Sequence, residues 1–206
     1  MLAKWKIIIL ISLASASIIT VGVLKTGKHV PDLLENIIIE PPRLLQSFNL
    51  VDHENKNVDL NRILNNWTFI FFGYTNCPDV CPATLAQMSL LSNAIDNLAG
   101  DTYSVQYFFV SVDPQRDSKN TLAAYIRYFG SRFVGMTGTQ ADITAFENQF
   151  GALHRMERNS HRDSYSLQHS ADVYLINPAG KLQARFQPPL DIGRVIKQVA
   201  RLAEFE

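Results

Sequence analysis

The stretch WTFIFFGYTNCPDVCPATL, residues 67–85, leads from a hydrophobic segment into a pair of cysteines. Its first part, Trp67–Tyr74, is an almost unbroken apolar and aromatic run, which is typical of a strand buried on both faces of a largely parallel sheet. Its second part opens an amphipathic segment, Pro82–Leu98, with apolar residues at helical spacing. The stretch therefore predicts a buried strand, a short loop that carries both cysteines, and a helix.

The rest of the chain alternates between strand-like and helix-like segments. Strands are expected at residues 48–51, 57–60, 105–112, 132–138, 172–177 and 181–186, and helices at residues 118–129, 139–150 and 191–203. The polar residues 154–166 are most simply a solvated loop. The strand–helix–strand order implies right-handed parallel crossovers, and the final hairpin adds an antiparallel edge. We therefore expect one α/β domain, with a mixed sheet flanked by helices on both faces.

The charge of the chain is unevenly distributed. All 19 Asp and Glu residues follow residue 31, whereas four of the 19 Lys and Arg residues precede it, which leaves the later part with a net charge of −4. A nucleic-acid-binding domain would be expected to show a basic face. The balance therefore argues against nucleic acid as a partner.

The N-terminal residues form a separate segment. Ile7–Leu24 contains 18 residues without a charge, which as a helix would span about 27 Å, close to the hydrocarbon thickness of a bilayer. The small residues Ala14–Ser17 would suit a cleaved signal peptide, but the apolar run continues past them. We therefore expect an uncleaved transmembrane helix in residues 1–25, a tether in residues 26–43 and a globular domain in residues 44–206.

Cys77 and Cys81 are the only cysteines of the chain, and a proline follows each of them. A loop between a strand and a helix N-terminus directs backbone N–H groups at the thiols and is expected to lower their pKa. A disulfide that holds the fold together is disfavoured, because so short a loop removes little entropy from the unfolded chain. A lone catalytic cysteine would leave the second one unexplained. Thiol–disulfide exchange and metal binding remain, and residues at i and i+4 on a helix share one face, where two thiolates would suit Cu(I).

A third ligand would make such a metal site more specific, and the chain has five histidines. His29 lies in the expected tether, His53 in a hairpin turn, and His154 and His161 in the expected polar loop. His169 lies directly before a strand that is expected to neighbour the strand leading to the cysteines. A histidine in that position is, by itself, more often structural than a ligand.

Three motifs in this order resemble the Sco/SenC family of membrane-tethered copper proteins. They are FFGYTNCPDVCPATL at residues 71–85, FVSVDPQRDS at residues 109–118 and LQHSADVYLINPAG at residues 167–180. The resemblance implies a thioredoxin-like (peroxiredoxin-related) fold. It also implies a copper site, for Cu(I) or Cu(II), in which Cys77 and Cys81 supply thiolate ligands and His169 supplies an imidazole.

The resemblance further implies a function and a location. We therefore expect a metallochaperone and not an enzyme. Its expected role is to help assemble the binuclear copper centre in subunit II of cytochrome c oxidase. The alternative is a thiol–disulfide oxidoreductase that reduces the copper-ligating cysteines of that subunit. Other expected partners are periplasmic copper carriers and thiol reductants. The expected location is the bacterial inner membrane, spanned once with the domain facing the periplasm, or the mitochondrial inner membrane in a eukaryote.

Two acidic residues also match positions of the family. They are Asp79, between the cysteines, and Asp113, in the second motif. We interpret them as a charge at a helix N-terminus and as a turn cap, respectively.

Overall fold

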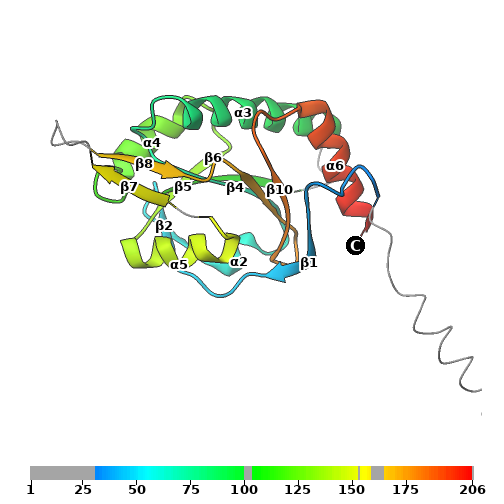
Figure 1. Cartoon of the computed structure of the whole chain (residues 1–206), viewed down its shortest axis with the longest axis horizontal. Coiled ribbons are helices and arrows are strands. Elements are labelled where there is room, and N and C mark those ends of the chain that lie inside the picture. The colour runs from blue at the N-terminus through cyan, green and yellow to red at the C-terminus, as the bar shows by residue number, and fades with distance from the viewer. Residues whose placement is uncertain (1–30, 100–103, 153, 159–164, 206) are drawn as a thin grey trace, which may run out of the picture. The chain divides into compact units, whose positions relative to one another are not determined.

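The computed structural model describes residues 31–99, 104–152, 154–158 and 165–205 (Figure 1). The chain divides into two compact units, residues 1–35 and residues 36–206. Only residues 31–35 of the first unit are described, and they form a turn in which the Leu34 N–H donates to the Pro31 carbonyl. All the strands and helices below belong to the second unit.

The second unit is built on a sheet of eight strands in the order β1-β10-β9-β4-β5-β6-β2-β3. Its strands are β1 (Ile38–Leu44), β2 (Leu50–Asp52), β3 (Asn57–Val58), β4 (Trp67–Gly73), β5 (Val105–Ser111), β6 (Phe133–Thr137), β9 (Val173–Ile176) and β10 (Lys181–Phe186). The pairs β4–β5 and β5–β6 are parallel, and the other pairs are antiparallel. The expected mixed sheet and the antiparallel hairpin of β9 and β10 are confirmed, but β1, and not the hairpin, forms that edge of the sheet.

Helices cover both faces of this sheet. They are α2 (Leu60–Ile63), α3 (Val80–Ala99), α4 (Lys119–Arg127), α5 (Gln140–Phe150) and α6 (Ile192–Phe205). Figure 1 shows α3 and α6 on one face and α2 and α5 on the other. Two parallel crossovers, through α3 and α4, therefore connect the three central strands β4, β5 and β6, as the sequence order predicts.

Aromatic side chains pack against the central strands. Every residue of β4 is buried, which agrees with its unbroken apolar sequence. The rings of Phe69 and Tyr107 stack across β4 and β5 with centroids 5.4 Å apart, and Phe72 meets Phe150 and Tyr174 edge-on at 5.2 and 5.9 Å. This packing makes the end of β4 a rigid platform for the loop that follows it.

The helix boundaries follow capping residues that the sequence displays. The Ser118 hydroxyl accepts a hydrogen bond from the Thr121 N–H (3.1 Å) at the start of α4. The Thr139 hydroxyl does the same for Asp142 (3.2 Å) at the start of α5. Helix α5 ends at Gly151 in the left-handed conformation, with φ of 68°. The predicted boundaries of these two helices are confirmed to within two residues.

Strand β1 lies inside the segment that we expected to be a tether. Residues 38–44 pair with β10 at the edge of the sheet, and the register shifts between Ile38 and Arg43. The strand was not expected because Pro41 and Pro42 cannot donate backbone hydrogen bonds to a β-ladder, but an edge strand tolerates prolines. The expected tether, residues 26–43, therefore includes most of a strand.

The prediction of a solvated loop at residues 154–166 was wrong in part. Strands β7 (His154–Arg158) and β8 (Tyr165–His169) pair in an antiparallel two-stranded sheet of their own. Their many polar residues suggested a loop. A ribbon that projects from the main sheet (Figure 1) needs few apolar side chains, so its sequence can be as polar as that of a loop. The ribbon leads directly through His169 towards β9.

In the described ranges, no helix combines the length and the hydrophobicity needed to cross a membrane. The expected anchor, residues 1–25, lies outside those ranges.

Candidate functional site

The two cysteines lie together where β4 gives way to α3. Both are buried, with 8% of Cys77 and 0% of Cys81 exposed, and both are free thiols. The Cys77 N–H donates to the Tyr74 carbonyl (3.2 Å), which turns the chain, and the Cys81 N–H then donates to the Cys77 sulfur (3.4 Å). Cys77 precedes the helix, so the pair does not share a helical face as we expected. The turn brings the pair together instead, and an amide of the first turn of α3 points at sulfur.

The thiols interact directly, and this shows in the acidity of Cys81. A hydrogen bond to the Cys77 side chain, and next to it burial, raise the pKa of Cys81 well above the usual range, whereas a backbone hydrogen bond at Tyr74 acts in the opposite direction. The expected lowering of thiol pKa by the helix N-terminus therefore does not hold for Cys81. The sulfur neighbour and the dry surroundings outweigh the amide groups.

Gly73, the last residue of β4, makes room for the Cys81 sulfur. A Cβ atom at this position would lie 2.7 Å from the Cys81 Sγ and 2.7 Å from the Phe109 Cε2. Ordinary van der Waals contacts of a Cβ begin at about 3.4 Å. The glycine is therefore required by the close approach of sulfur and ring to the strand, not by its backbone angles.

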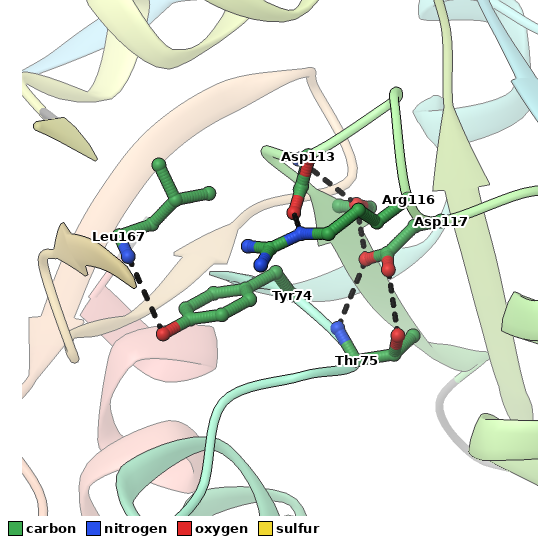
Figure 2. Close-up of polar contacts among 7 residues, drawn as sticks. Tyr74, Thr75, Asp113, Arg116, Asp117 and Leu167 are labelled. Carbon is green, nitrogen blue, oxygen red and sulfur yellow. Dashed lines mark hydrogen bonds and ion pairs between the residues drawn. The ribbon is translucent and has the colours of Figure 1, made fainter. Parts of the chain in front are cut away.

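Asp117 holds the first part of the cysteine loop (Figure 2). Its carboxylate, 1% exposed, accepts hydrogen bonds from the Thr75 N–H (2.9 Å), the Thr75 hydroxyl (2.6 Å) and the Ser111 hydroxyl (2.6 Å). Thr75 lies two residues before Cys77, so this carboxylate ties the loop to the end of β5. We did not single out Asp117 from the sequence. Its only signal there is a second acidic residue in DPQRDS, beside the cap Ser118.

Asp113 and Arg116 contact the same loop through the ring of Tyr74. The Asp113 carbonyl accepts from the N–H groups of Arg116 (3.2 Å) and Asp117 (2.9 Å), so the residue opens a turn through its backbone; these bonds do not test the side-chain turn cap that we expected. Its carboxylate also pairs with the Arg116 guanidinium, and that guanidinium lies 5.5 Å from the centre of the Tyr74 ring. In Figure 2 the guanidinium lies between Asp113 and the ring of Tyr74. Asp79, by contrast, is exposed, and its carbonyl accepts from the Ala83 N–H in the first turn of α3 (3.2 Å).

Tyr74 links the cysteine loop to the ribbon that ends at His169. Its hydroxyl accepts a hydrogen bond from the Leu167 N–H (3.4 Å), two residues before His169 on β8 (Figure 2). Strand β9, which follows His169 closely, pairs with β4, as we expected. The backbone therefore brings the three predicted ligand residues to one end of the sheet, through β4, α3 and β8.

Ligation by His169 stays a prediction. Among the side chains that the structure describes, no three His, Cys, Asp or Glu residues form a group that could hold a metal ion. Of the other histidines, His53 accepts a hydrogen bond from the Gly135 N–H at Nδ1 (3.2 Å), which gives it a structural role. His29 and His161 lie outside the described residues.

The strand–loop–helix arrangement of two free thiols, on a mixed sheet flanked by helices, defines a thioredoxin-like domain with a two-cysteine site. The model of the SCO1/SenC family matches residues 38–204, and the chain belongs to that family.

Individual relatives agree with this assignment. The protein Sco1 of Schizosaccharomyces pombe is 34% identical over 142 residues, which are 68% of this chain and 53% of the relative, so the chain matches only about half of that protein. The SCO2-like protein of Rickettsia typhi is 30% identical over 188 residues, 88% of this chain and 89% of the relative. Among solved structures, that of Bradyrhizobium japonicum ScoI with copper bound has a TM-score of 0.69 at 28% identity, and covers 77% of this chain and 98% of ScoI.

Proposed function

We propose that this protein is a copper chaperone that binds copper through Cys77, Cys81 and His169. The observation that carries the proposal is the pair of free, buried thiols held together by the Cys81 N–H···Sγ contact of 3.4 Å. Membership of a family in which ScoI is solved with copper bound supports copper as the cargo.

The chemistry of the three side chains suits copper. Thiolate sulfur is a soft ligand that favours Cu(I), and imidazole nitrogen is accepted by Cu(II) as well, so one site can hold either state. The loop is prepared for this role by the Asp117 carboxylate, which fixes Thr75, and by Gly73, which lets the Cys81 sulfur approach the strand. A loop held on both sides loses little entropy when a metal ion binds.

We further propose that the chaperone delivers copper to the binuclear centre in subunit II of cytochrome c oxidase. Residues 1–25 would anchor it in the inner membrane and place the domain in the periplasm, or in the corresponding compartment of mitochondria. Such an anchor confines the search for a membrane-bound partner to the membrane surface. Family membership and the uncharged segment Ile7–Leu24 support this part of the proposal.

A second function, thiol–disulfide exchange, is favoured by the same two thiols. The direct hydrogen bond between their side chains would allow them to close a disulfide while they reduce one in a partner. This function needs no imidazole, whereas a three-ligand copper site needs His169.

The test compares the purified full-length protein with His169→Ala, and uses His53→Ala as the control. With wild type we expect one copper per chain after dialysis of reduced protein and, for Cu(II), a sulfur-to-copper charge-transfer band. His169→Ala is expected to shift or abolish the Cu(II) spectrum, to weaken Cu(I) binding only in part, and to retain exchange with a model disulfide. The control is expected to leave all three unchanged.

Loss of copper from reduced wild-type protein would contradict the ligand assignment. Wild-type Cu(II) spectra in His169→Ala would exclude His169 as a ligand and favour the exchange function.

A further inference from the structure

Tyr125, on α4, has a buried hydroxyl group that makes no hydrogen bond with any residue that the structure describes. The side chain as a whole is half-buried, but its hydroxyl oxygen is shielded from solvent. Buried polar groups are nearly always paired, because an unpaired one loses its hydrogen bonds to water without replacement. An unpaired hydroxyl of this kind therefore calls for a functional explanation.

The ring of Tyr125 packs against one side of the cysteine site. Its centroid lies 5.5 Å from that of Phe109, on β5, and the two planes are tilted by 45°. The Phe109 ring and the Cys81 sulfur approach the same point beside Gly73, each 2.7 Å from where a Cβ would lie. Burial raises the pKa of Tyr125, and negative charge at Cys81 and then at Cys77 raises it further. The hydroxyl is therefore within electrostatic reach of both sulfurs.

A charged sulfur is the acceptor that this hydroxyl lacks in the thiol form. A thiol sulfur accepts hydrogen bonds only weakly, whereas a negatively charged acceptor forms short and strong ones. Cys81 is 0% exposed, so water cannot supply a donor to its sulfur. The charge of Asp117 acts on Tyr125 as well, but that carboxylate already accepts from Thr75 and Ser111. The sulfur of Cys81 is therefore the acceptor best matched to the hydroxyl.

We propose that the Tyr125 hydroxyl donates a hydrogen bond to the Cys81 sulfur when that sulfur carries negative charge, either bound to copper or closing a disulfide. Tyr125 is then a positioning residue, which acts on the site through a ligand. The bond forms only in the charged state, so the hydroxyl and the sulfur must move towards each other as that state is reached. The role of Cys81 as a ligand rests on the proposed function.

The experiment compares Tyr125→Phe with Tyr107→Phe in the full-length protein. Tyr107 is the matched control because its hydroxyl is also buried and, among the described residues, unpaired. After burial, the charges that act on the pKa of Tyr107 are those of Asp96, which raises it, and Arg132, which lowers it. Tyr125→Phe is expected to bind copper about 10–100-fold more weakly, because a hydrogen bond to a charged group is lost.

Two further readouts report on the sulfur itself. Loss of a donor makes a thiolate a better electron donor, so the sulfur-to-copper band of Tyr125→Phe should move to lower energy. The Cu(II)/Cu(I) reduction potential should fall, because hydrogen bonds at a ligating sulfur tune that potential. Tyr107→Phe is expected to match wild type in affinity, band and potential.

Urea unfolding of the metal-free, reduced proteins tests whether the hydroxyl is unpaired before loading. Both variants are expected to be at least as stable as wild type, because each removes a polar group that has no partner. A midpoint for Tyr125→Phe below those of wild type and Tyr107→Phe would show that the hydroxyl is already bonded in the thiol form, and would overturn the proposal.

Exchange of the metal-free protein with a model disulfide separates this inference from the proposed function. Tyr125→Phe is expected to close its own disulfide more slowly than wild type, and Tyr107→Phe at the wild-type rate. If wild type binds copper and Tyr125→Phe matches it in affinity, band and potential, this inference fails and the proposed function stands. If wild type binds no copper but Tyr125→Phe alone slows exchange, the copper function fails and this inference stands. If wild type binds no copper and both variants exchange like wild type, both fail.

Discussion

Replacing Gly73 with alanine tests how closely the copper-binding loop is fitted to the sheet. The added Cβ would lie 2.7 Å from the Cys81 sulfur and 2.7 Å from the Phe109 ring. Neither neighbour can yield easily, because Cys81 belongs to α3 and the Phe109 ring is fully buried. Both must retreat by about 0.7 Å to reach ordinary contact. Overpacking of this kind costs about 1–3 kcal/mol of unfolding free energy, which for a chain of this size is a fall in Tm of roughly 2–12 °C.

The assay is thermal and urea unfolding of the full-length protein, together with the sulfur-to-copper spectrum of the Cu(II) form. Gly193→Ala, in the first turn of α6, is the matched control, because its nearest contact would be an ordinary 3.7 Å. We expect it to be neutral or slightly stabilising. If Gly73→Ala unfolds within about 0.5 kcal/mol of wild type, the range of neutral surface substitutions, and keeps the wild-type spectrum, the close-approach argument is wrong.

Four further predictions concern stability, thiol oxidation, alkaline unfolding and membrane topology. Asp117→Ala should lower the unfolding free energy by at least about 1–3 kcal/mol in urea titrations, because the buried Ser111 hydroxyl loses its acceptor and the two part-buried donors of Thr75 lose theirs as well; the exposed Glu204→Ala should change it little. Oxidation of Cys77 and Cys81 to a disulfide should abolish the sulfur-to-copper band while adding no more than about 2 kcal/mol of stability; a larger loss on reduction would indicate a structural cross-link. Burial raises the pKa of Tyr107, so the stability it contributes should be complete below its unfolded pKa of about 10 and be lost as the pH rises above it; alkaline unfolding monitored by tyrosinate absorbance checks this. Protease added to spheroplasts should remove the domain if residues 1–25 anchor it facing the periplasm, and protection would reverse that topology.

The sequence predicted those parts of the fold whose signals are local. The unbroken apolar run of β4 and the caps Ser118 and Thr139 lie within the elements they define, so they could be found without the structure. Strand β1 was missed because its pairing with β10 is remote in sequence and its prolines argue against a strand. The ribbon was missed because its polar residues show no regular alternation that would distinguish two strands from a loop.

The same distinction between local signals and contacts remote in sequence applies to the candidate site. The cysteine pair stands out in the sequence because the two residues are close neighbours, whereas the groups that hold it come from elsewhere. Asp117 reaches Thr75 across 42 residues, and Tyr74 reaches Leu167 across 93. Such contacts depend on the order of strands in the sheet, which places the ends of β4, β5 and β8 together, and no local pattern encodes them.

The two outer strands of the sheet have a consequence for the behaviour of the protein in a crowded compartment. An open sheet exposes unpaired backbone groups at its edges, and these can recruit another chain and start aggregation. Here one edge is β1, whose prolines Pro41 and Pro42 lack an N–H and stand between the charged Glu40 and Arg43. The other edge is β3, which is only two residues long. Both edges of the eight-stranded sheet are therefore poor templates for strand addition, so copies of the protein are not expected to join edge to edge through that sheet.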